Sequence, residues 1–492
     1  MSKLHLQDYI KEICEKSATI EEIFGSNFRS ECPNEELGFD ASEILANWCL
    51  TSTGGNWENF NKLLALRKLS QDEVISRLYS QPKNFLDPNH LYRTEMESVF
   101  KCLTSNGVLL DKKINARLPF IELYTTLVHY AYQKLLLDMN GRCDASIPES
   151  VYREIASDLF KNISDLLSEP LFDTFQNLKL SLKKNHPNID SYKSFIFYMI
   201  DDGFYILFRS YPVLLRVLTN MIMQWIESNA ELISRLNQDL SSVSVKFKLT
   251  NQSISQVESI QSGLSDPHNF GRTVKIISFI NGEKIVYKPK NLGPDKAWED
   301  LIDSLNAINP PVNLKACKIL AFKDYGWTEY HSNDSCKDAS GINSFYFRSG
   351  AQLAIFYLLA STDMHEENII AAGEYPIPID LEMLLQPDAK EKRYDNSKNE
   401  AHDFAIRQLA DSVLSIGILP SYSILPNNVF VKVGALNSSI STKIRKTWID
   451  LGTEKLNYKL EKTLLDDGKN IPKYNSEKIG IDNFVGEFTK GF

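Results

Sequence analysis

The residues best suited to chemistry are an Asp, a His and an Asn that stand close together, followed by a second acidic pair. Asp363, His365 and Asn368 fall within one short segment, and Asp380 and Glu382 come after an apolar stretch. An Asp in this position can orient a hydroxyl group, while Asn and Asp oxygens can hold Mg²⁺ against nucleotide phosphates. The types and order of these residues therefore predict a phosphoryl-transfer site.

These five residues do not follow the motifs of ordinary protein kinases. The chain contains neither an HRD nor a DFG tripeptide, and Asp-x-His-x-x-Asn followed by Asp-x-Glu is more like an atypical, lipid-kinase-like site. A purely structural role for the whole group is disfavoured, because burying several carboxylates without a cation is costly.

Lys288 is the residue expected to reach the nucleotide. It follows the second of two β-rich segments, 274–280 and 284–287, which flank an Asn-Gly pair typical of a two-residue hairpin turn. A lysine there can contact nucleotide phosphates, and Glu299 on the next helix is expected to orient it. An ordinary surface lysine and a solvated helix face remain the alternatives.

The segment before this hairpin holds further candidates. Asp266 and His268 can act as an acid–base pair, and Gly271 can let backbone amides approach a phosphate. Asp-Pro-His is also typical of an ordinary turn, and that alternative stays open. Residues 326–330, Gly-Trp-Thr-Glu-Tyr, fit either a hinge behind an adenine or a core aromatic strand.

Such a site needs a small β-rich region followed by a helical one. The patterns predict a helical N-terminal region at 1–240, a β-rich kinase-like N-lobe and hinge at 241–339, and a helical C-lobe with the catalytic and metal loops at 340–492. The predicted fold class is α+β, mostly helical, with an atypical, lipid-kinase-like two-lobed fold.

Several smaller elements follow from local patterns. The alternation of polar and apolar residues predicts a strand at 243–249, and Gly-Pro-Asp predicts a helix that begins at Gly293. A buried helix is expected at 345–359, an exposed charged loop at 387–402, and helices from there to the end.

Bulk properties limit the classes of function. The 492 residues allow two or three domains, the 43% apolar and 24% charged residues are ordinary for a globular protein, and the net charge of −9 argues against nucleic-acid binding. Seven scattered cysteines without a CxxC pattern argue against a zinc site and indicate a reducing, cytoplasmic location. The most apolar stretch, 204–223, contains Arg209, Pro212 and Arg216 and fits a buried helical hairpin better than an integral membrane segment.

At these motifs the chain resembles the N-terminal dehydratase domain of type 2 lanthipeptide synthetases, the LanM family. The resemblance covers the chain from about residue 92 to the end. It is carried by Asp-Pro-His-Asn-Phe-Gly-Arg at 266–272, Val-Tyr-Lys-Pro at 286–289, Tyr-Gly-Trp-x-Glu at 325–329, Thr-Asp-Met-His-x-x-Asn at 362–368 and Ile-Asp-Leu-Glu at 379–382.

The resemblance implies a fold similar to phosphoinositide kinases and a two-step reaction. With ATP and Mg²⁺, the family phosphorylates Ser and Thr of a ribosomal precursor peptide, which has a leader and a Ser/Thr/Cys-rich core, and then eliminates the phosphate. By position, the implied catalytic residues are Asp363, His365, Asp266 and His268, the nucleotide-binding residues are Lys288, Asn368, Asp380 and Gly271, and the Mg²⁺ ligands are Asn368, Asp380 and Glu382.

The chain departs from the family in length. The family's Arg and Thr for elimination, and its zinc-containing cyclase domain, are expected beyond Phe492, so we expect a chain that phosphorylates but makes little alkene, without zinc. Two alternatives stay open: a catalytically incomplete fragment that only binds peptide or nucleotide, and a lipid or small-molecule kinase. The second is disfavoured because no dense Lys/Arg cluster lies beside the motifs.

Overall fold

The computed structural model describes most of the chain. The described residues are 3–17, 19, 41–79, 91–105, 118–139, 147–186, 188–250, 256–385, 404–405, 408–425, 429–437, 442–464 and 468–492. They form two compact units, the first from residues 1–135, 159–227 and 450–455 and the second from residues 136–158, 228–449 and 456–492. All predicted site residues belong to the second unit.

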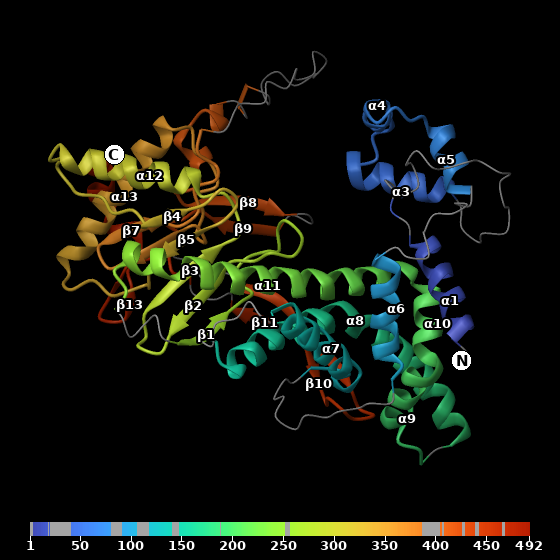
Figure 1. Cartoon of the computed structure of the whole chain (residues 1–492). Helices are drawn as coiled ribbons and strands as arrows, with labels where there is room; N and C mark the ends of the chain where they lie inside the picture. Colours follow the sequence, from blue (N-terminus) through green and yellow to red (C-terminus); the bar gives the residue numbers. More distant parts are fainter. Residues whose placement is uncertain are drawn as a thin grey trace. The chain divides into compact units, whose positions relative to one another are not determined.

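Helices dominate the described part of the N-terminal half, as the sequence predicts (Figure 1). They are α1 (Lys3–Lys16), α3 (Ala41–Thr53), α4 (Trp57–Leu66), α5 (Gln71–Tyr79), α6 (Leu91–Leu103), α7 (Ile121–Met139), α8 (Glu149–Asn185), α9 (Ser191–Tyr198), the π-helix η1 (Met199–Gly203), α10 (Phe204–Ser210) and α11 (Pro212–Phe247). The chain is mostly helical with a small antiparallel sheet, which confirms the α+β class.

The apolar stretch at 204–223 bends at Tyr211, between α10 and α11. Phe204, Phe208, Leu215 and Leu218 are buried on these helices. In the described part of the chain no single helix has the length and apolar character to cross a membrane, although the bent pair 191–210 and 212–247 reaches that threshold jointly, with 106° between its halves.

The strand predicted at 243–249 is wrong, because α11 continues through Phe247. Val243 is fully buried and lies seven residues after the buried Leu236, a spacing of two helical turns. Since a long helix adds one backbone hydrogen bond for each further residue, it extends through a segment whose local alternation favours a strand. The helix ends where Lys248 adopts a positive φ of 58°.

A five-stranded antiparallel sheet forms the β-rich region. Its order is β1-β2-β3-β5-β4, and the strands are β1 (Val257–Gln261), β2 (Lys275–Phe279), β3 (Lys284–Lys288), β4 (Ile319–Ala321) and β5 (Gly326–Glu329). The predicted hairpin around Asn281-Gly282 is confirmed, with Gly282 at φ 84° in the turn. The helix predicted from Gly293 is α12 (Gly293–Ala307), between β3 and β4 in the chain.

The region after α13 (Ser340–Leu358) contains strands, so the expectation of helices to the end is wrong. The elements are β6 (Ile369–Ala372), β7 (Tyr375–Pro378), the 3₁₀ helix η3 (Val413–Ile416), β8 (Ser421–Leu425), β9 (Val429–Val433), β10 (Thr442–Ile449), β11 (Asn457–Leu464), β12 (Lys473–Tyr474), β13 (Glu477–Lys478), η4 (Ile481–Asn483) and α15 (Val485–Gly491). These strands form two-stranded antiparallel hairpins, and Lys473 of β12 also forms a parallel bridge with Ser335. The loop predicted at 387–402 lies outside the described residues.

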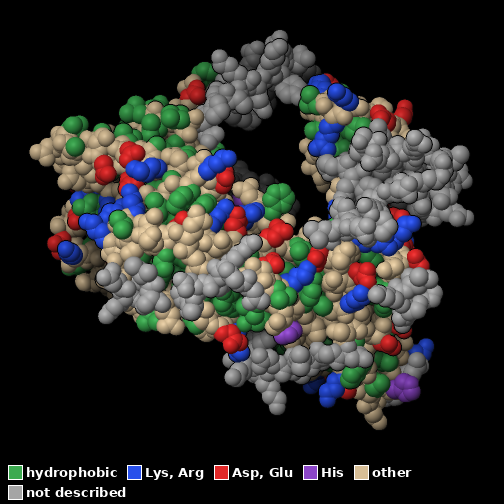
Figure 2. All heavy atoms as spheres, in the orientation of Figure 1, with side chains coloured by type: hydrophobic (Ala, Val, Ile, Leu, Met, Phe, Trp, Pro, Cys, Tyr) green, Lys and Arg blue, Asp and Glu red, His purple; other side chains and the backbone are tan. Residues whose placement is uncertain are grey.

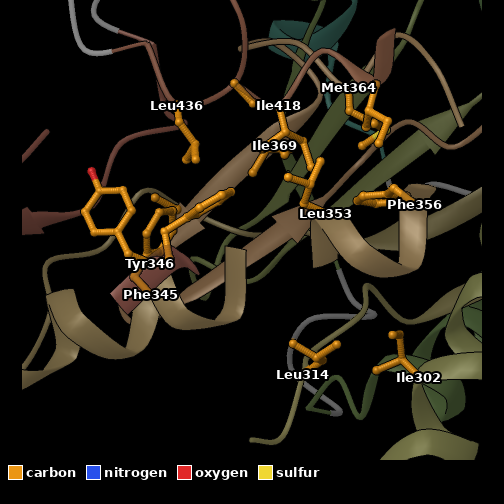
Figure 3. Packing of buried hydrophobic residues seen from close by; sticks show 14 of the residues in the cluster. Ile302, Leu314, Phe345, Tyr346, Leu353, Phe356, Met364, Ile369, Ile418 and Leu436 are labelled. Atoms are coloured by element: carbon orange, nitrogen blue, oxygen red, sulfur yellow. The ribbon is translucent and has the colours of Figure 1, made fainter. Parts of the chain in front are cut away.

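The main core of the second unit packs around α13. Phe345, Leu353 and Phe356 of this helix are buried together with Met364 and Ile369 (Figure 3). Trp298 of α12 stacks on Phe356, with ring centroids 4.6 Å apart. Met364 lies between Asp363 and His365, and Ile369 follows Asn368, so this core holds the predicted catalytic loop at two positions.

The C-terminal half of α11 is attached to the sheet by polar contacts. Asp239 accepts hydrogen bonds of 2.9 Å from both Tyr325 Oη and Trp327 Nε1, and Arg235 donates to Tyr287 Oη at 2.5 Å.

Acidic and basic side chains are interspersed on the face of the molecule shown in Figure 2.

Candidate phosphoryl-transfer site

The loop 363–368 connects α13 to β6 and is held at several points. Asp363 has a positive φ of 66°, a conformation that Asp tolerates better than most residues. Its carbonyl oxygen accepts a 2.8 Å hydrogen bond from Asn368 Nδ2, and the backbone amide of Met364 donates to Ile416 O at 2.8 Å. The Met364 side chain is buried, so the backbone of the loop is fixed while the Asp363 side chain is exposed.

His365 faces Asp363 across this loop. The backbone amide of Glu367 donates to His365 Nδ1 at 3.2 Å, and His365 Nε2 lies 3.5 Å from Asp363 Oδ1. Nε2 also lies 3.4 Å from Asn368 Nδ2, so this ring nitrogen contacts both Asp363 and Asn368. The arrangement is suited to holding the Asp363 side chain in one orientation.

Asn368 and Asp380 lie at the same end of the β6–β7 hairpin. Asn368 precedes β6, Ile379 follows β7, and Ile379 N donates to Asn368 O at 2.9 Å. The chain therefore brings the two predicted segments together, as the apolar hairpin between them indicates. Since Asn368 Nδ2 is used by Asp363 O, the amide oxygen Oδ1 is the atom that suits a cation.

Lys288 is buried at the end of β3 and does not reach solvent. Its Nζ donates to Ile379 O and lies 3.6 Å from Asp295 Oδ1, with only 8% and 3% of the two side chains exposed. Burial raises the pKa of Asp295 above its ordinary value, and Lys288 and Lys290 offset this only in part. Lys288 thus ties the start of α12 to the backbone just before Asp380.

The expectation that Glu299 orients Lys288 is wrong. Glu299 instead pairs with Lys246 at 2.9 Å and Lys296 at 3.4 Å. Asp295 is in the first turn of α12, one turn before Glu299, and it holds the position next to Lys288. A carboxylate in the first turn also interacts favourably with the positive end of the helix dipole.

A second lysine neutralises the predicted metal ligands. Lys290 Nζ lies 2.5 Å from Asp380 Oδ1 and 2.8 Å from Glu382 Oε2. Burial tends to lower the pKa of Lys290, but the two carboxylates outweigh it and raise the pKa above the ordinary value. The side-chain oxygens of Asp380 and Glu382 thus converge on one positive group, and the role of Asn368, Asp380 and Glu382 as Mg²⁺ ligands stays a prediction.

The metal-ligand set is small. In the described part of the chain, no group of three or more His, Cys, Asp or Glu side chains is arranged to hold a metal ion. Mg²⁺ commonly takes only one or two carboxylates from a protein and completes its coordination with phosphate and water, so a pair such as Asp380 and Glu382 is chemically compatible with the prediction.

The turn 266–272 is separate from this constellation. Asp266 and His268 are exposed, and His268 and Arg272 exchange two backbone hydrogen bonds of 2.9 Å around Asn269, Phe270 and Gly271, which all have positive φ. Within the described ranges, no hydrogen bond or ion pair joins this turn to residues 363–382. The turn reading is confirmed for the local conformation, and the acid–base role of Asp266 and His268 stays a prediction.

Residues 326–330 include a core strand. β5 lies between β3 and β4, and the Trp327 side chain is fully buried beneath α11. The core aromatic strand is therefore confirmed, and the role of this segment as a hinge behind an adenine stays a prediction.

Three residues of the site were missed by the sequence reasoning. Asp295 and Lys290 have been described above, and the third is Gly417, with a φ of 89°, where a Cβ atom would lie 3.2 Å from Met364 N. Lys290 stands two residues after Lys288, just beyond the end of β3, and a second lysine so close to the predicted one is the signal that could have found it. Gly417 is distant in sequence and gave no signal.

Comparison with known proteins gives two findings. Residues 211–492 match the family model described as "Domain of unknown function (DUF4135)". The chain is also 27% identical, over 218 residues, to the "Lacticin 481/lactococcin biosynthesis protein LcnDR2" of Lactococcus lactis subsp. lactis. This alignment covers 43% of the present chain and 23% of the relative, so the chain spans only a minor part of that protein.

Proposed function

This chain belongs to the DUF4135 family and to the type 2 lanthipeptide synthetases, and on that premise we propose that it acts in lanthipeptide biosynthesis. The proposed reaction is phosphorylation of Ser and Thr hydroxyls of a ribosomal precursor peptide, with ATP and Mg²⁺, by an atypical lipid-kinase-like fold. The similarity to a lacticin 481/lactococcin biosynthesis protein supports the proposal.

The observation that carries this proposal is the meeting of two polar segments at the open end of the β6–β7 hairpin. Asp363, His365 and Asn368 come before β6, and Asp380 and Glu382 come after β7. Phosphoryl transfer needs a group that orients the attacking hydroxyl beside groups that hold the metal and nucleotide, and these two segments supply both kinds.

In the proposed mechanism, Asp363 orients the peptide hydroxyl and accepts its proton. A bond forms between the peptide oxygen and the γ-phosphorus, while the bond from that phosphorus to the bridging oxygen of ADP breaks. His365 keeps the Asp363 carboxylate in place through Nε2, since its other ring nitrogen is held by the Glu367 amide. When bound by Asn368 Oδ1, Asp380 and Glu382, Mg²⁺ supplies neutralisation of phosphate charge.

Asp266 and His268 are proposed to serve the later elimination of phosphate, and Gly271 is proposed to bind nucleotide phosphate. That step needs a base for the α-proton and donors for the departing phosphate. The exposed side chains of Asp266 and His268 and the turn amides near Gly271 are chemically suited to these tasks. Because this turn is separate from residues 363–382, the two steps are proposed to use separable groups.

Mass spectrometry tests the proposal directly. The chain is incubated with ATP, Mg²⁺ and a precursor peptide with a leader and a Ser/Thr-rich core, and each phosphorylation adds about 80 Da while each net dehydration removes about 18 Da. We expect the mass gain with the wild type and its loss with Asp363→Ala. An unmodified peptide that nevertheless binds to the folded chain would contradict the kinase proposal.

The second candidate function is a module that binds peptide or nucleotide without turnover. Binding without modification is the result that this candidate predicts. One observation favours it: the carboxylates of Asp380 and Glu382 are already paired with Lys290. A chain whose metal ligands are permanently occupied by lysine would bind nucleotide without transferring phosphate. The behaviour of Lys290 therefore decides between the two candidates.

A further inference from the structure

Two lysines at the end of β3 make contacts of different kinds. Lys288 is 8% exposed and its ammonium is engaged by Asp295 and by the carbonyl oxygen of Ile379. Lys290 is 23% exposed and contacts only side-chain carboxylates among its recorded hydrogen bonds, those of Asp380 and Glu382. The first lysine is built into the fold, whereas the second can leave its partners by side-chain rotation.

The charges around Lys290 resemble a cation site with its cation in place. Two carboxylates that follow β7 converge on one ammonium. The side chains of Asp380 and Glu382 are partly exposed, by 33% and 56%. A divalent cation that takes the same oxygens has to displace the ammonium, because two positive groups at that separation repel each other. Solvent access on this side permits the exchange.

We propose that Lys290 is an internal counter-ion of Asp380 and Glu382, which a divalent cation displaces, and that the freed ammonium then contacts the anionic phosphates that arrive with the cation. This inference rests on the proposed function, since it takes the acidic pair as the metal ligands. It assigns the mobile phosphate-contacting lysine to Lys290 and leaves Lys288 as the residue that positions the backbone before Asp380.

The lysine side chain suits this exchange. An ammonium is a compact charge on a flexible stem, so it can move between carboxylate and phosphate without loss of hydrogen-bond geometry. It also prevents repulsion between Asp380 and Glu382 while no cation is bound. The cation and the nucleotide are then expected to bind cooperatively, because the group released by the first is a ligand for the second.

The test measures binding of Mn²⁺, used as a spectroscopic substitute for Mg²⁺, to the full chain by electron paramagnetic resonance. Without nucleotide, Lys290→Met is expected to bind Mn²⁺ about 10-fold more tightly than the wild type, because the competing positive charge is lost. Lys290→Arg keeps that charge, so its Mn²⁺ affinity is expected to remain within about 2-fold of the wild-type value. With a non-hydrolysable ATP analogue present, Lys290→Met is expected to bind the nucleotide about 10-fold more weakly.

Two control variants separate the possible failures. Lys296→Met removes the same charge from an exposed ion pair of α12 and is expected to keep the wild-type Mn²⁺ affinity. Asp380→Asn is expected to weaken Mn²⁺ binding, both in the otherwise wild-type chain and in the Lys290→Met variant. Circular dichroism and a thermal melt of each variant establish that it is folded.

The outcomes distinguish the inference from the function on which it rests. If Asp380→Asn weakens Mn²⁺ binding but Lys290→Met does not strengthen it, the exchange is overturned while the metal site stands. If Asp380→Asn has no effect, the acidic pair is not the cation site and the proposed function loses its metal ligands as well. Tighter Mn²⁺ binding by Lys290→Met, with no phosphorylation by the wild type, upholds the exchange and overturns only the kinase proposal.

Discussion

The two regions that carry predicted chemistry are built in opposite ways. Residues 363–382 are connected to two distant parts of the chain. Met364 contacts η3, and the end of β3 is reached twice, through Ile379 to Lys288 and through Asp380 to Lys290. The turn 266–272 is closed by its own two backbone hydrogen bonds and attached elsewhere by Arg272 to Glu231 at 2.6 Å. The first region is organised by the fold before any ligand binds, whereas the second presents exposed groups on a local turn.

This contrast predicts where substitutions are felt. Changes in the first region should alter stability and phosphoryl transfer together, because its polar groups are also long-range contacts. Changes at exposed positions of the turn should leave the fold intact and affect only a step in which that turn takes part.

The largest effect on activity is expected from Asp363→Ala. Loss of the group that orients the hydroxyl and accepts its proton should lower the phosphorylation rate by about 10³-fold, while nucleotide affinity changes by less than about 2-fold. Phosphorylation is followed by mass spectrometry and nucleotide affinity by calorimetry, with the exposed helix residue Asp303→Ala as the control. An equal loss in both measurements would assign Asp363 to nucleotide binding instead.

The largest effect on stability is expected from Lys288→Met. It leaves the Asp295 carboxylate buried without its partner and should lower the free energy of unfolding by about 3–5 kcal/mol. Urea denaturation followed by the fluorescence of the buried Trp298 and Trp327 measures this. The double variant Lys288→Met with Asp295→Asn should recover part of the loss, and an additive or greater loss would show that the two side chains are not coupled.

The pH dependence of stability should follow Asp295. Its raised pKa means that the folded state holds the proton more tightly than the unfolded state does, so this carboxyl lowers stability as pH rises from the ordinary Asp range through its folded pKa. Each unit of the raised pKa accounts for about 1 kcal/mol. As pH rises above the range in which an ordinary Asp titrates, the wild type should therefore lose stability relative to Asp295→Asn. A difference that does not vary with pH would show that Asp295 does not titrate there.

A moderate effect is expected from Gly417→Ala. The positive φ and the close approach to Met364 should reduce the free energy of unfolding by about 1–2 kcal/mol and displace the loop that carries Asp363. Gly486→Ala is the matched control, because its Cβ meets nothing within 4 Å and it lies inside α15, where Ala is favoured. Equal stability of the two variants would remove the claimed constraint on the loop.

The smallest effect on the fold is expected from Asp266→Ala and His268→Ala. Both side chains are exposed, so stability should change by less than about 0.5 kcal/mol and phosphorylation should continue. If the phosphate-elimination role is right, phosphopeptide accumulates with these variants wherever the wild type makes alkene. A loss of phosphorylation in these variants would show that the turn 266–272 takes part in the same step as residues 363–382, and the two regions would then not differ in the way described.

Elements with strong local signals could be predicted from the amino-acid sequence before the fold was known. The Asn-Gly turn fixed the β2–β3 hairpin, since few residues other than these accept the backbone conformation of such a turn. The Gly-Pro-Asp start at Gly293 likewise predicted a helix, and the structure has it as α12. The order of motifs from Asp266 to Glu382 also indicated the family, and the match of residues 211–492 confirmed it.

The tertiary structure alone decided which charged side chains are partners. Lys288 pairs with Asp295 and not Glu299 because the start of α12, rather than its middle, lies against the end of β3. The strand predicted at 243–249 became helix because neighbouring turns of α11 outweighed local alternation. Asp239 of that same helix hydrogen-bonds to Tyr325 and Trp327 of the sheet region. Contacts between residues far apart in the chain leave no periodic pattern, so neither the Asp295 pair nor the packing of Gly417 on Met364 could be found before the fold was known.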